Sequence, residues 1–202
     1  MDAAWAGAAL LLAEHRSLFA GIEDADSVTI DPHKWLCVPR GAGLYLARDW
    51  APLKRAFAVR ASYMPAAAVE RRDPYRHSLQ WSRRFIGLSL FMVLAVDGLE
   101  GVRERIRRQV GIGARLRERL LAEGWRIWND TPLPLVCFSP AGETGDEAVR
   151  AIERDVVNSG EAWISSVGLG GRLVLRACVT SYETGEADIE VLLRRLRMAG
   201  AG

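Results

Sequence analysis

Apolar and polar positions in the first part of the chain alternate between helix-like and strand-like patterns. An apolar run rich in small residues over 3–19 predicts a buried helix that ends near Gly21. The β-branched stretch 27–31 and the apolar stretch 43–47 predict short strands, and 49–57 predicts a short helix. Small residues in the first helix would let it pack closely on the sheet that these strands form.

A long loop and a long helix follow. The stretch 61–81 contains two prolines and no sustained period, which predicts a long loop, and loops of this length are usually functional or disordered. Apolar residues return at helical spacing over 83–121, with a break expected at Asp97-Gly98. Asp97 and Glu100 have the spacing of a capping box that would restart the helix after the break.

The second half of the chain has the pattern of a small α+β module. Four strands and two helices are predicted, with strands at 125–128, 135–138, 161–165 and 173–179 and helices at 145–158 and 185–198. Thr144 and Glu147 are predicted to form a second capping box. One apolar face is expected on the last helix, made of Ile189, Leu192, Leu193 and Leu196. We therefore expect two domains, 1–105 and 106–202.

Composition and charge exclude several functional classes. Half of the 202 residues are hydrophobic and 26% are charged, as in an ordinary globular protein, and the net charge of +2 predicts neither a nucleic-acid partner nor an anionic membrane partner. The apolar run near the start ends in charge too early to cross a bilayer, and it lacks the basic start of a targeting signal. Cys37, Cys137 and Cys178 lie far apart, so we expect reduced thiols in the cytoplasm and no metal site.

One lysine stands where a predicted strand ends, in the stretch ADSVTIDPHKW at 25–35. A lysine in this place can be a solvated turn residue or can use its amine for chemistry. Together with DAAWAG at 2–7, QWSRRFIGLSLF at 80–91 and LRACVTSYET at 175–184, the stretch resembles the pyridoxal-phosphate-dependent group II amino acid decarboxylases, with the aromatic amino acid type as the nearest branch. The resemblance spans nearly the whole chain. It implies an α/β fold, namely the C-terminal part of a fold type I pyridoxal-phosphate enzyme, with an incomplete large domain and a small α+β domain.

The resemblance also implies roles for five residues near the cofactor. Lys34 matches the lysine that forms a Schiff base with the cofactor aldehyde, and Asp2 matches the acid that pairs with the pyridine nitrogen. Ala4 matches a small residue near the ring. His33 and Asp31 match positions beside the phosphate, where His33 could donate a hydrogen bond but an ionised Asp31 could not.

Two further residues have competing interpretations. Tyr75 matches the tyrosine of a mobile loop that would return a proton after carbon dioxide leaves, although it could equally be an aromatic residue resting on the surface. Arg176 could grip a substrate carboxylate or form a structural ion pair. For Arg83 and Arg84, which precede the long helix, we expect packing and ion pairing.

The first residues have no room before Asp2 for the strand that the family places there, so we expect the C-terminal portion of a longer enzyme. The function implied is decarboxylation of an L-amino acid, aromatic ones before acidic ones, by a protein that is a homodimer when full length. Two alternatives stay open. The chain could be a non-catalytic remnant or assembly partner, or it could belong to another fold type I enzyme, such as an aldehyde-forming decarboxylase or a transaminase.

Overall fold

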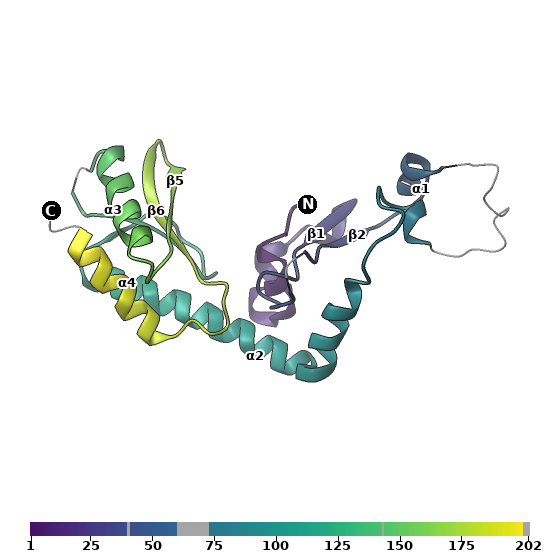
Figure 1. Ribbon diagram of the computed structural model, residues 1–202, viewed down its shortest axis with the longest axis horizontal. Helices are drawn as coiled ribbons and strands as arrows, with labels where there is room; N and C mark the ends of the chain where they lie inside the picture. Colours follow the sequence, from purple (N-terminus) through teal and green to yellow (C-terminus); the bar gives the residue numbers. More distant parts are fainter. Residues whose placement is uncertain (40, 60–72, 143, 200–202) are drawn as a thin grey trace. The chain divides into compact units, whose positions relative to one another are not determined.

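The computed structural model describes residues 1–39, 41–59, 73–142 and 144–199, and the chain divides into two compact units, Met1–Val96 and Asp97–Gly202 (Figure 1). Helix α2 (Gly87–Ala122) contains the division, and Gly98 within it has non-helical backbone angles, φ 67° and ψ 168°. The expected break at Asp97-Gly98 is therefore confirmed, and the division falls earlier in the helix than the expected boundary near residue 105. The assignment of the first unit to cofactor binding stays a prediction.

The first unit is built around a two-stranded antiparallel ribbon. Strands β1 (Ser27–Ile30) and β2 (Leu44–Ala47) pair with Ser27 opposite Ala47, which confirms both expected strands. The remaining elements are short, namely the 3-10 helices η1 (Ala6–Leu11), η2 (Ala13–Phe19), η3 (Ile22–Asp24) and η4 (Pro74–Arg76) and the helix α1 (Ala51–Phe57). Of the long loop expected over 61–81, residues 60–72 lie outside the described part of the chain.

The helix expected over 3–19 is wrong in type. Two 3-10 helices replace it, because Leu12 between them has an extended backbone, with φ −93° and ψ 120°, and is completely buried. Gly7 in the first of them approaches β1 so closely that a Cβ atom would lie 2.7 Å from Cγ1 of Ile30. Close packing on the strand thus outweighs the preference of an alanine-rich segment for a regular α-helix.

The second unit is a four-stranded antiparallel sheet with helices on one face. It contains β3 (Arg126–Ile127), β4 (Leu135–Ser139), α3 (Asp146–Asn158), β5 (Ser165–Leu169), β6 (Arg172–Cys178) and α4 (Glu186–Ala199), and the strand order is β3-β4-β6-β5. The core joins α2, α3 and α4 to alternate residues of β4 and β6, including Phe138 and Leu175. The expected apolar face of α4 is confirmed, since its four residues all lie in this core.

Three local predictions for the second unit are wrong. The strand expected at 161–165 lies instead at Ser165–Leu169, because Gly170 and Gly171, with φ 60° and 79°, form a two-residue hairpin loop that pairs β5 with β6. Helix α3 begins after Gly145 without a side-chain cap, and the carboxylate of Glu147 pairs with Arg154 along the helix. The capping box at residue 97 is likewise absent from the described structure, where Glu100 pairs with two arginines of α2.

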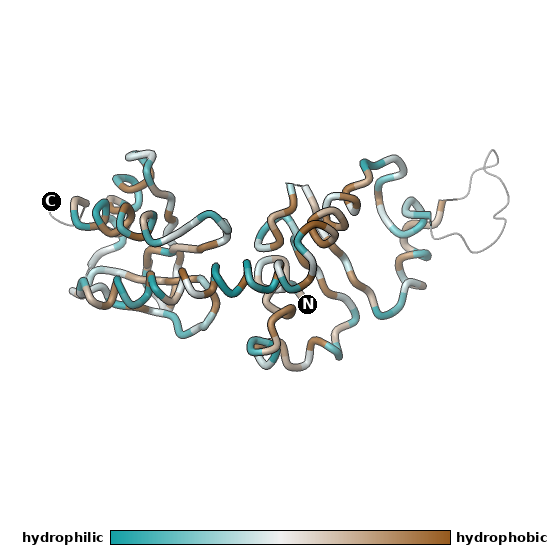
Figure 2. The backbone as a smooth tube through the Cα atoms, turned by 90° about the horizontal axis from the view of Figure 1, so that it is seen from below, coloured by the Kyte–Doolittle hydropathy of each residue, from teal (hydrophilic) through white to brown (hydrophobic). Residues whose placement is uncertain are grey.

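The N-terminal part of α2 and the segment before it are apolar and exposed. Leu79 is 85% exposed, Phe85 79% and Val96 76%, and hydrophobic colour runs along this part of the backbone before the helix turns hydrophilic (Figure 2). An exposed apolar surface of this kind usually marks an interaction site. Among the described helices, none combines the length and the hydropathy that crossing a bilayer requires.

Candidate active site

The first four residues run parallel to β1 and are hydrogen-bonded to it. The amide of Thr29 donates to the carbonyl of Met1, the amide of Ala3 donates to the carbonyl of Thr29, and the amide of Asp31 donates to the carbonyl of Ala4, at 3.2, 3.0 and 3.0 Å. Asp2 therefore lies beside Thr29, and Ala4 lies beside the end of β1. In open α/β sheets, ligands bind at the carboxyl ends of the strands, which is where these residues lie.

Two hydrogen bonds orient the carboxylate of Asp2. Its Oδ1 accepts from the amide of Ala4 at 2.9 Å and from the hydroxyl of Thr29 at 3.5 Å. The residue is exposed. Thr29 was not predicted as a site residue, because its contact with Asp2 requires the first residues to lie parallel to β1.

The lysine lies on a tight turn directly after β1. The amide of Lys34 donates to the carbonyl of Asp31 at 3.0 Å, and the amide of Cys37 donates to the carbonyl of Lys34 at 3.1 Å. Pro32 within the turn restricts the backbone further. Trp35 is completely buried and packs edge-on against Trp5, with ring centroids 4.6 Å apart. The buried tryptophan anchors the turn and leaves the neighbouring lysine side chain 33% exposed.

Asp31 lies between the side chains of Lys34 and His33. Its Oδ2 is 2.9 Å from Nζ of Lys34 and 3.9 Å from Nε2 of His33. The other ring nitrogen of His33, Nδ1, lies 2.6 Å from the carbonyl oxygen of Ala42. A carbonyl can only accept, so Nδ1 carries the hydrogen, and Nε2 is the nitrogen left for a ligand. The lysine is thus paired with an internal carboxylate and is not an isolated solvated residue.

Tyr75 has contacts within its own segment. Its hydroxyl accepts a hydrogen bond from Nε of Arg76 at 3.1 Å, and its ring lies 5.4 Å from the ring of Trp81. The adjacent His77 packs edge-on against Trp50, 5.2 Å between centroids, which ties the segment to the start of α1. The catalytic role of Tyr75 stays a prediction, because its contacts in the described structure do not include Lys34 or Asp2.

The two arginine predictions have different outcomes. Arg83 donates to the carbonyl oxygens of Gln80 and Pro74, at 2.8 and 3.4 Å, so it holds the loop together as expected for a packing residue. Arg176 donates to the hydroxyl of Ser165 at 3.5 Å and has no recorded carboxylate partner in the described part of the chain. The structural ion pair expected as one alternative is therefore not seen for Arg176.

Arg176 has a buried thiol as its neighbour across the sheet. Cys137 on β4 is its register partner, and burial raises the pKa of the Cys137 thiol, an effect that Arg176 partly offsets. No disulfide joins Cys37, Cys137 or Cys178, and no cluster of three metal-ligating side chains occurs among the described residues.

Comparison with known proteins identifies relatives of one kind. Residues 1–140 match the family model described as the pyridoxal-dependent decarboxylase conserved domain. An aromatic-L-amino-acid decarboxylase of Manduca sexta is 32% identical over 95% of this chain and 38% of its own length. A 3,4-dihydroxyphenylacetaldehyde synthase of Aedes aegypti is 28% identical over 94% of this chain and 37% of its own length.

A solved structure confirms the likeness in three dimensions. The crystal structure of Oryza sativa TDC with PLP and tryptamine superimposes with a TM-score of 0.91 at 28% identity, covering 99% of this chain and 44% of that chain. The chain therefore spans less than half of the length of each of these relatives. The expected fold class, an α/β part of a fold type I pyridoxal-phosphate enzyme, is confirmed.

Proposed function

Because the chain belongs to the pyridoxal-dependent decarboxylase family, we propose that it supplies the lysine-bearing part of an enzyme that converts an L-amino acid into an amine and carbon dioxide. One observation carries the proposal. Lys34, Asp31 and His33 gather at the carboxyl end of β1, and the adjoining parallel segment carries Asp2. All of these residues lie within the part of the chain that matches the family.

The donor groups of this cluster fit pyridoxal phosphate. An amine that is one-third exposed suits an aldehyde, and an exposed carboxylate suits a pyridinium nitrogen. His33 would donate to a phosphate oxygen only with Nε2 protonated, because its Nδ1 hydrogen is directed at the carbonyl of Ala42. When bound, the cofactor would supply an electron-withdrawing ring that takes up the electron pair left on the α-carbon when carbon dioxide departs. Asp2 holds a proton on the ring nitrogen, since a nearby negative charge favours the protonated form. Ala4 leaves space beside the ring.

The other site residues are assigned roles in proton transfer and in binding the substrate carboxylate. Lys34 would hold the cofactor through its aldehyde, and its amine, once free of that bond, would serve as a local base or acid. Asp31 is the counter-ion that orients the free amine of Lys34. Tyr75 delivers a proton to the substrate α-carbon, and Arg176 binds the substrate carboxylate through its unpaired guanidinium. We propose an aromatic substrate, because the relatives compared above include an aromatic-L-amino-acid decarboxylase.

Assembly and location are part of the same proposal. The exposed apolar residues Leu79, Phe85 and Val96 support a subunit contact, and we propose that the full-length protein is a homodimer. We propose a reducing compartment, the cytoplasm, because the three cysteines form no disulfide.

The chain contains only two lysines, which permits a sharp test of cofactor capture. The protein is incubated with pyridoxal phosphate, treated with borohydride to fix any bond to an amine, and digested for mass spectrometry. We expect at least tenfold more modification at Lys34 than at Lys54, although Lys54 on α1 is the more exposed of the two. Equal labelling, or preference for Lys54, would contradict the proposed role of Lys34.

Variants of the acids refine this test. Asp2→Asn is expected to weaken retention of the cofactor, and Asp26→Asn, an exposed residue just before β1, is the matched control. A folded chain that captures no cofactor at either lysine would favour the alternative of a non-catalytic assembly partner.

Product analysis separates amine formation from aldehyde formation, the second candidate, which the likeness to the aldehyde synthase supports. Carbon dioxide, amine and aldehyde are measured with a panel of aromatic and acidic amino acids. We expect amine as the product, and Tyr75→Phe should lower amine output severalfold while Tyr45→Phe on β2 leaves it unchanged. Unchanged amine output in Tyr75→Phe would remove the proton-donor role.

A further inference from the structure

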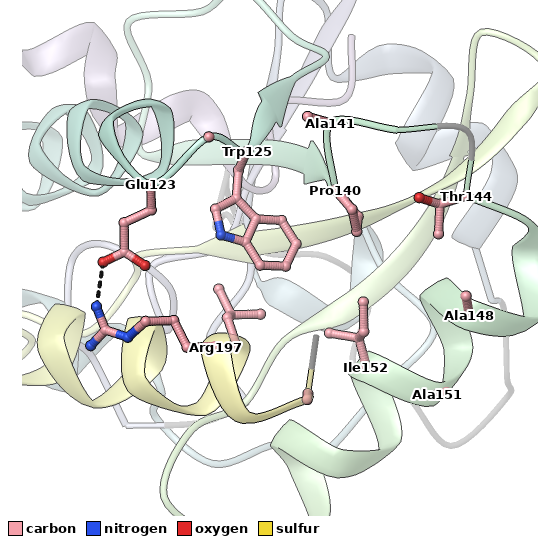
Figure 3. Close-up of a pocket in the computed structure, with 12 residues that line it drawn as sticks. Glu123, Trp125, Pro140, Ala141, Thr144, Ala148, Ala151, Ile152 and Arg197 are labelled. Carbon is pink, nitrogen blue, oxygen red and sulfur yellow. Dashed lines mark hydrogen bonds and ion pairs between the residues drawn. The ribbon is translucent and has the colours of Figure 1, made fainter. Parts of the chain in front are cut away.

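The second unit contains a groove of about 790 Å³ whose floor and walls come from α3, α4 and the strand ends near β3 and β4 (Figure 3). This volume is within the range of small-molecule sites. Ala148 and Ala151 on α3 are small, and the groove opens above Ile152 and the completely buried Leu196. The groove belongs to the second unit, whereas Lys34 belongs to the first.

An oriented aromatic side chain forms one wall. Trp125 packs edge-on against Phe138 of the core, with ring centroids 5.5 Å apart and an interplanar angle of 80°. This contact fixes the plane of the indole, and Figure 3 shows Trp125 between the ends of the groove that carry Glu123 and Thr144. A flat ring can therefore pack in the groove at a low cost in conformational entropy.

The polar end of the groove has one unused acceptor. Oε1 of Glu123 accepts a hydrogen bond from Nη1 of Arg197 at 2.7 Å, whereas Oε2 of Glu123 is buried without a partner among the described residues. A buried carboxylate oxygen that lacks a donor is costly. A ligand that brings an N–H donor to this end would remove the cost. Arg197 lines the same end, but its guanidinium is already paired with Oε1 of Glu123, so the oxygen that still lacks a donor favours a cationic ligand over an anion.

We propose that this groove binds a compact arylalkylamine, with its ring against Trp125 and Ile152 and its ammonium group donating to Glu123. A ligand of this class has an aromatic ring and a primary ammonium group, joined by a short alkyl chain. The proposed reaction also releases amines of this class, so the groove would be a second binding site for the product. Only the identification of the ligand as the product rests on the proposed function.

The test is a titration with 2-phenylethylamine, followed by NMR through the indole N–H resonance of Trp125. It is performed on the full chain with Lys34→Ala and without cofactor, so that the site around residue 34 contributes no covalent capture. We expect a saturable shift at Trp125 and a weaker shift with 3-phenylpropionate, which has the same ring and the opposite charge. Equal or tighter binding of the propionate would overturn the assignment of the ligand as an amine.

Two variants locate the binding, and one serves as control. Glu123→Gln is expected to weaken the amine at least tenfold, and Ala148→Phe, at an exposed position of α3, should abolish binding by filling the groove. Glu118→Gln on α2 removes a carboxylate outside the groove and should leave the affinity unchanged. An amine affinity that survives both Glu123→Gln and Ala148→Phe would refute the site. Cofactor capture by Lys34 is measured separately, so either proposal can fail while the other stands.

Discussion

Trp35 should decide whether the lysine turn keeps its shape, and its replacement gives a quantitative test of the site. The side chain has no exposed surface and contacts Trp5, which follows the segment that carries Asp2. Truncating a completely buried tryptophan to alanine costs about 3–5 kcal/mol. Since each ~1.4 kcal/mol is a factor of ten in an equilibrium constant, local opening of the turn should become more frequent by about two to three orders of magnitude or more.

A second replacement separates volume from hydrogen bonding. The indole Nε1 of Trp35 is buried without a hydrogen-bond partner in the described structure, and an unpaired donor of this kind costs about 1–3 kcal/mol. Trp35→Phe removes that donor and loses roughly two carbon atoms of burial, worth about 1.5 kcal/mol. The two effects oppose each other, so Trp35→Phe should change the stability of the turn by no more than about 1.5 kcal/mol.

Hydrogen exchange read by mass spectrometry measures this directly. The amides of Lys34, Cys37 and Val38 all donate within the turn, so a peptide over residues 32–38 reports its opening. Exchange in this peptide should be fast in Trp35→Ala and close to normal in Trp35→Phe, while a peptide from α3 in the second unit serves as internal control. Preferential capture of pyridoxal phosphate by Lys34 should follow the same order.

The reasoning fails if Trp35→Ala leaves exchange in residues 32–38 unchanged, because the turn would then be held by other contacts. It also fails if Trp35→Phe is as damaging as Trp35→Ala, because the indole N–H would then have a partner that compensates its burial.

Two further predictions concern the stability of the second unit. Gly111→Ala should stabilise α2 by about 1 kcal/mol, because none of the described atoms lies within 4 Å of a Cβ at residue 111. Gly113→Ala should instead destabilise the helix by about 1–3 kcal/mol, because a Cβ at residue 113 would lie 2.4 Å from Cα of Pro134. Urea unfolding measures both changes, and equal effects would contradict the steric argument. Hydrogen bonds from Arg195 and its neighbour lower the pKa of Glu161 to about 2, below its unfolded value near 4.3, so stability from this cluster is present above that value and is lost as pH falls toward 2. Glu161→Gln should therefore reduce the loss of stability in urea unfolding between pH 6 and pH 2, and an unchanged pH dependence would contradict the depressed pKa.

The elements that were predicted best from the sequence are those with buried residues repeating along one face. The helices expected at 145–158 and 185–198 are observed as α3 and α4 with nearly the same bounds. Each helix packs one apolar stripe on the sheet, so the spacing of its apolar residues is enough to predict it. The start of α3 was less predictable, because the helix begins at Asp146, after Gly145, without the side-chain cap that the Thr144 and Glu147 spacing suggested.

The misplaced strand has a different cause. The stretch 161–165 is apolar enough for a strand, but β5 begins only at Ser165 because its register is set by the turn at Gly170 and Gly171. A pair of glycines before an apolar run is a hairpin signal that was available in the sequence. The 3-10 geometry of residues 6–19 was not available in this way, because it depends on the approach of Gly7 to Ile30, a contact between segments.

For the site, the family resemblance indicated which residues to consider, and the structure showed which of them contact one another. Lys34, Asp31 and His33 could be named from a short motif, but the motif did not say that Asp31 would pair with Lys34 and lie next to His33. Nor did it indicate that Thr29 would orient Asp2, because that contact requires the first residues to lie parallel to β1. Tyr75 and Arg176 depend on contacts with a substrate, and their roles stay predictions.

The pairing of Asp31 with Lys34 explains how a cationic side chain is accommodated at the end of a strand. The carboxylate lies three residues earlier on a turn that Pro32 stiffens, so the counter-ion is supplied locally and the lysine needs no partner from elsewhere. The same geometry constrains any use of the amine, because an incoming aldehyde must draw Nζ away from a carboxylate 2.9 Å distant. An amine held in this way is oriented by the turn before it meets a carbonyl group, so the position of Asp31 fixes the starting geometry of any reaction at Lys34.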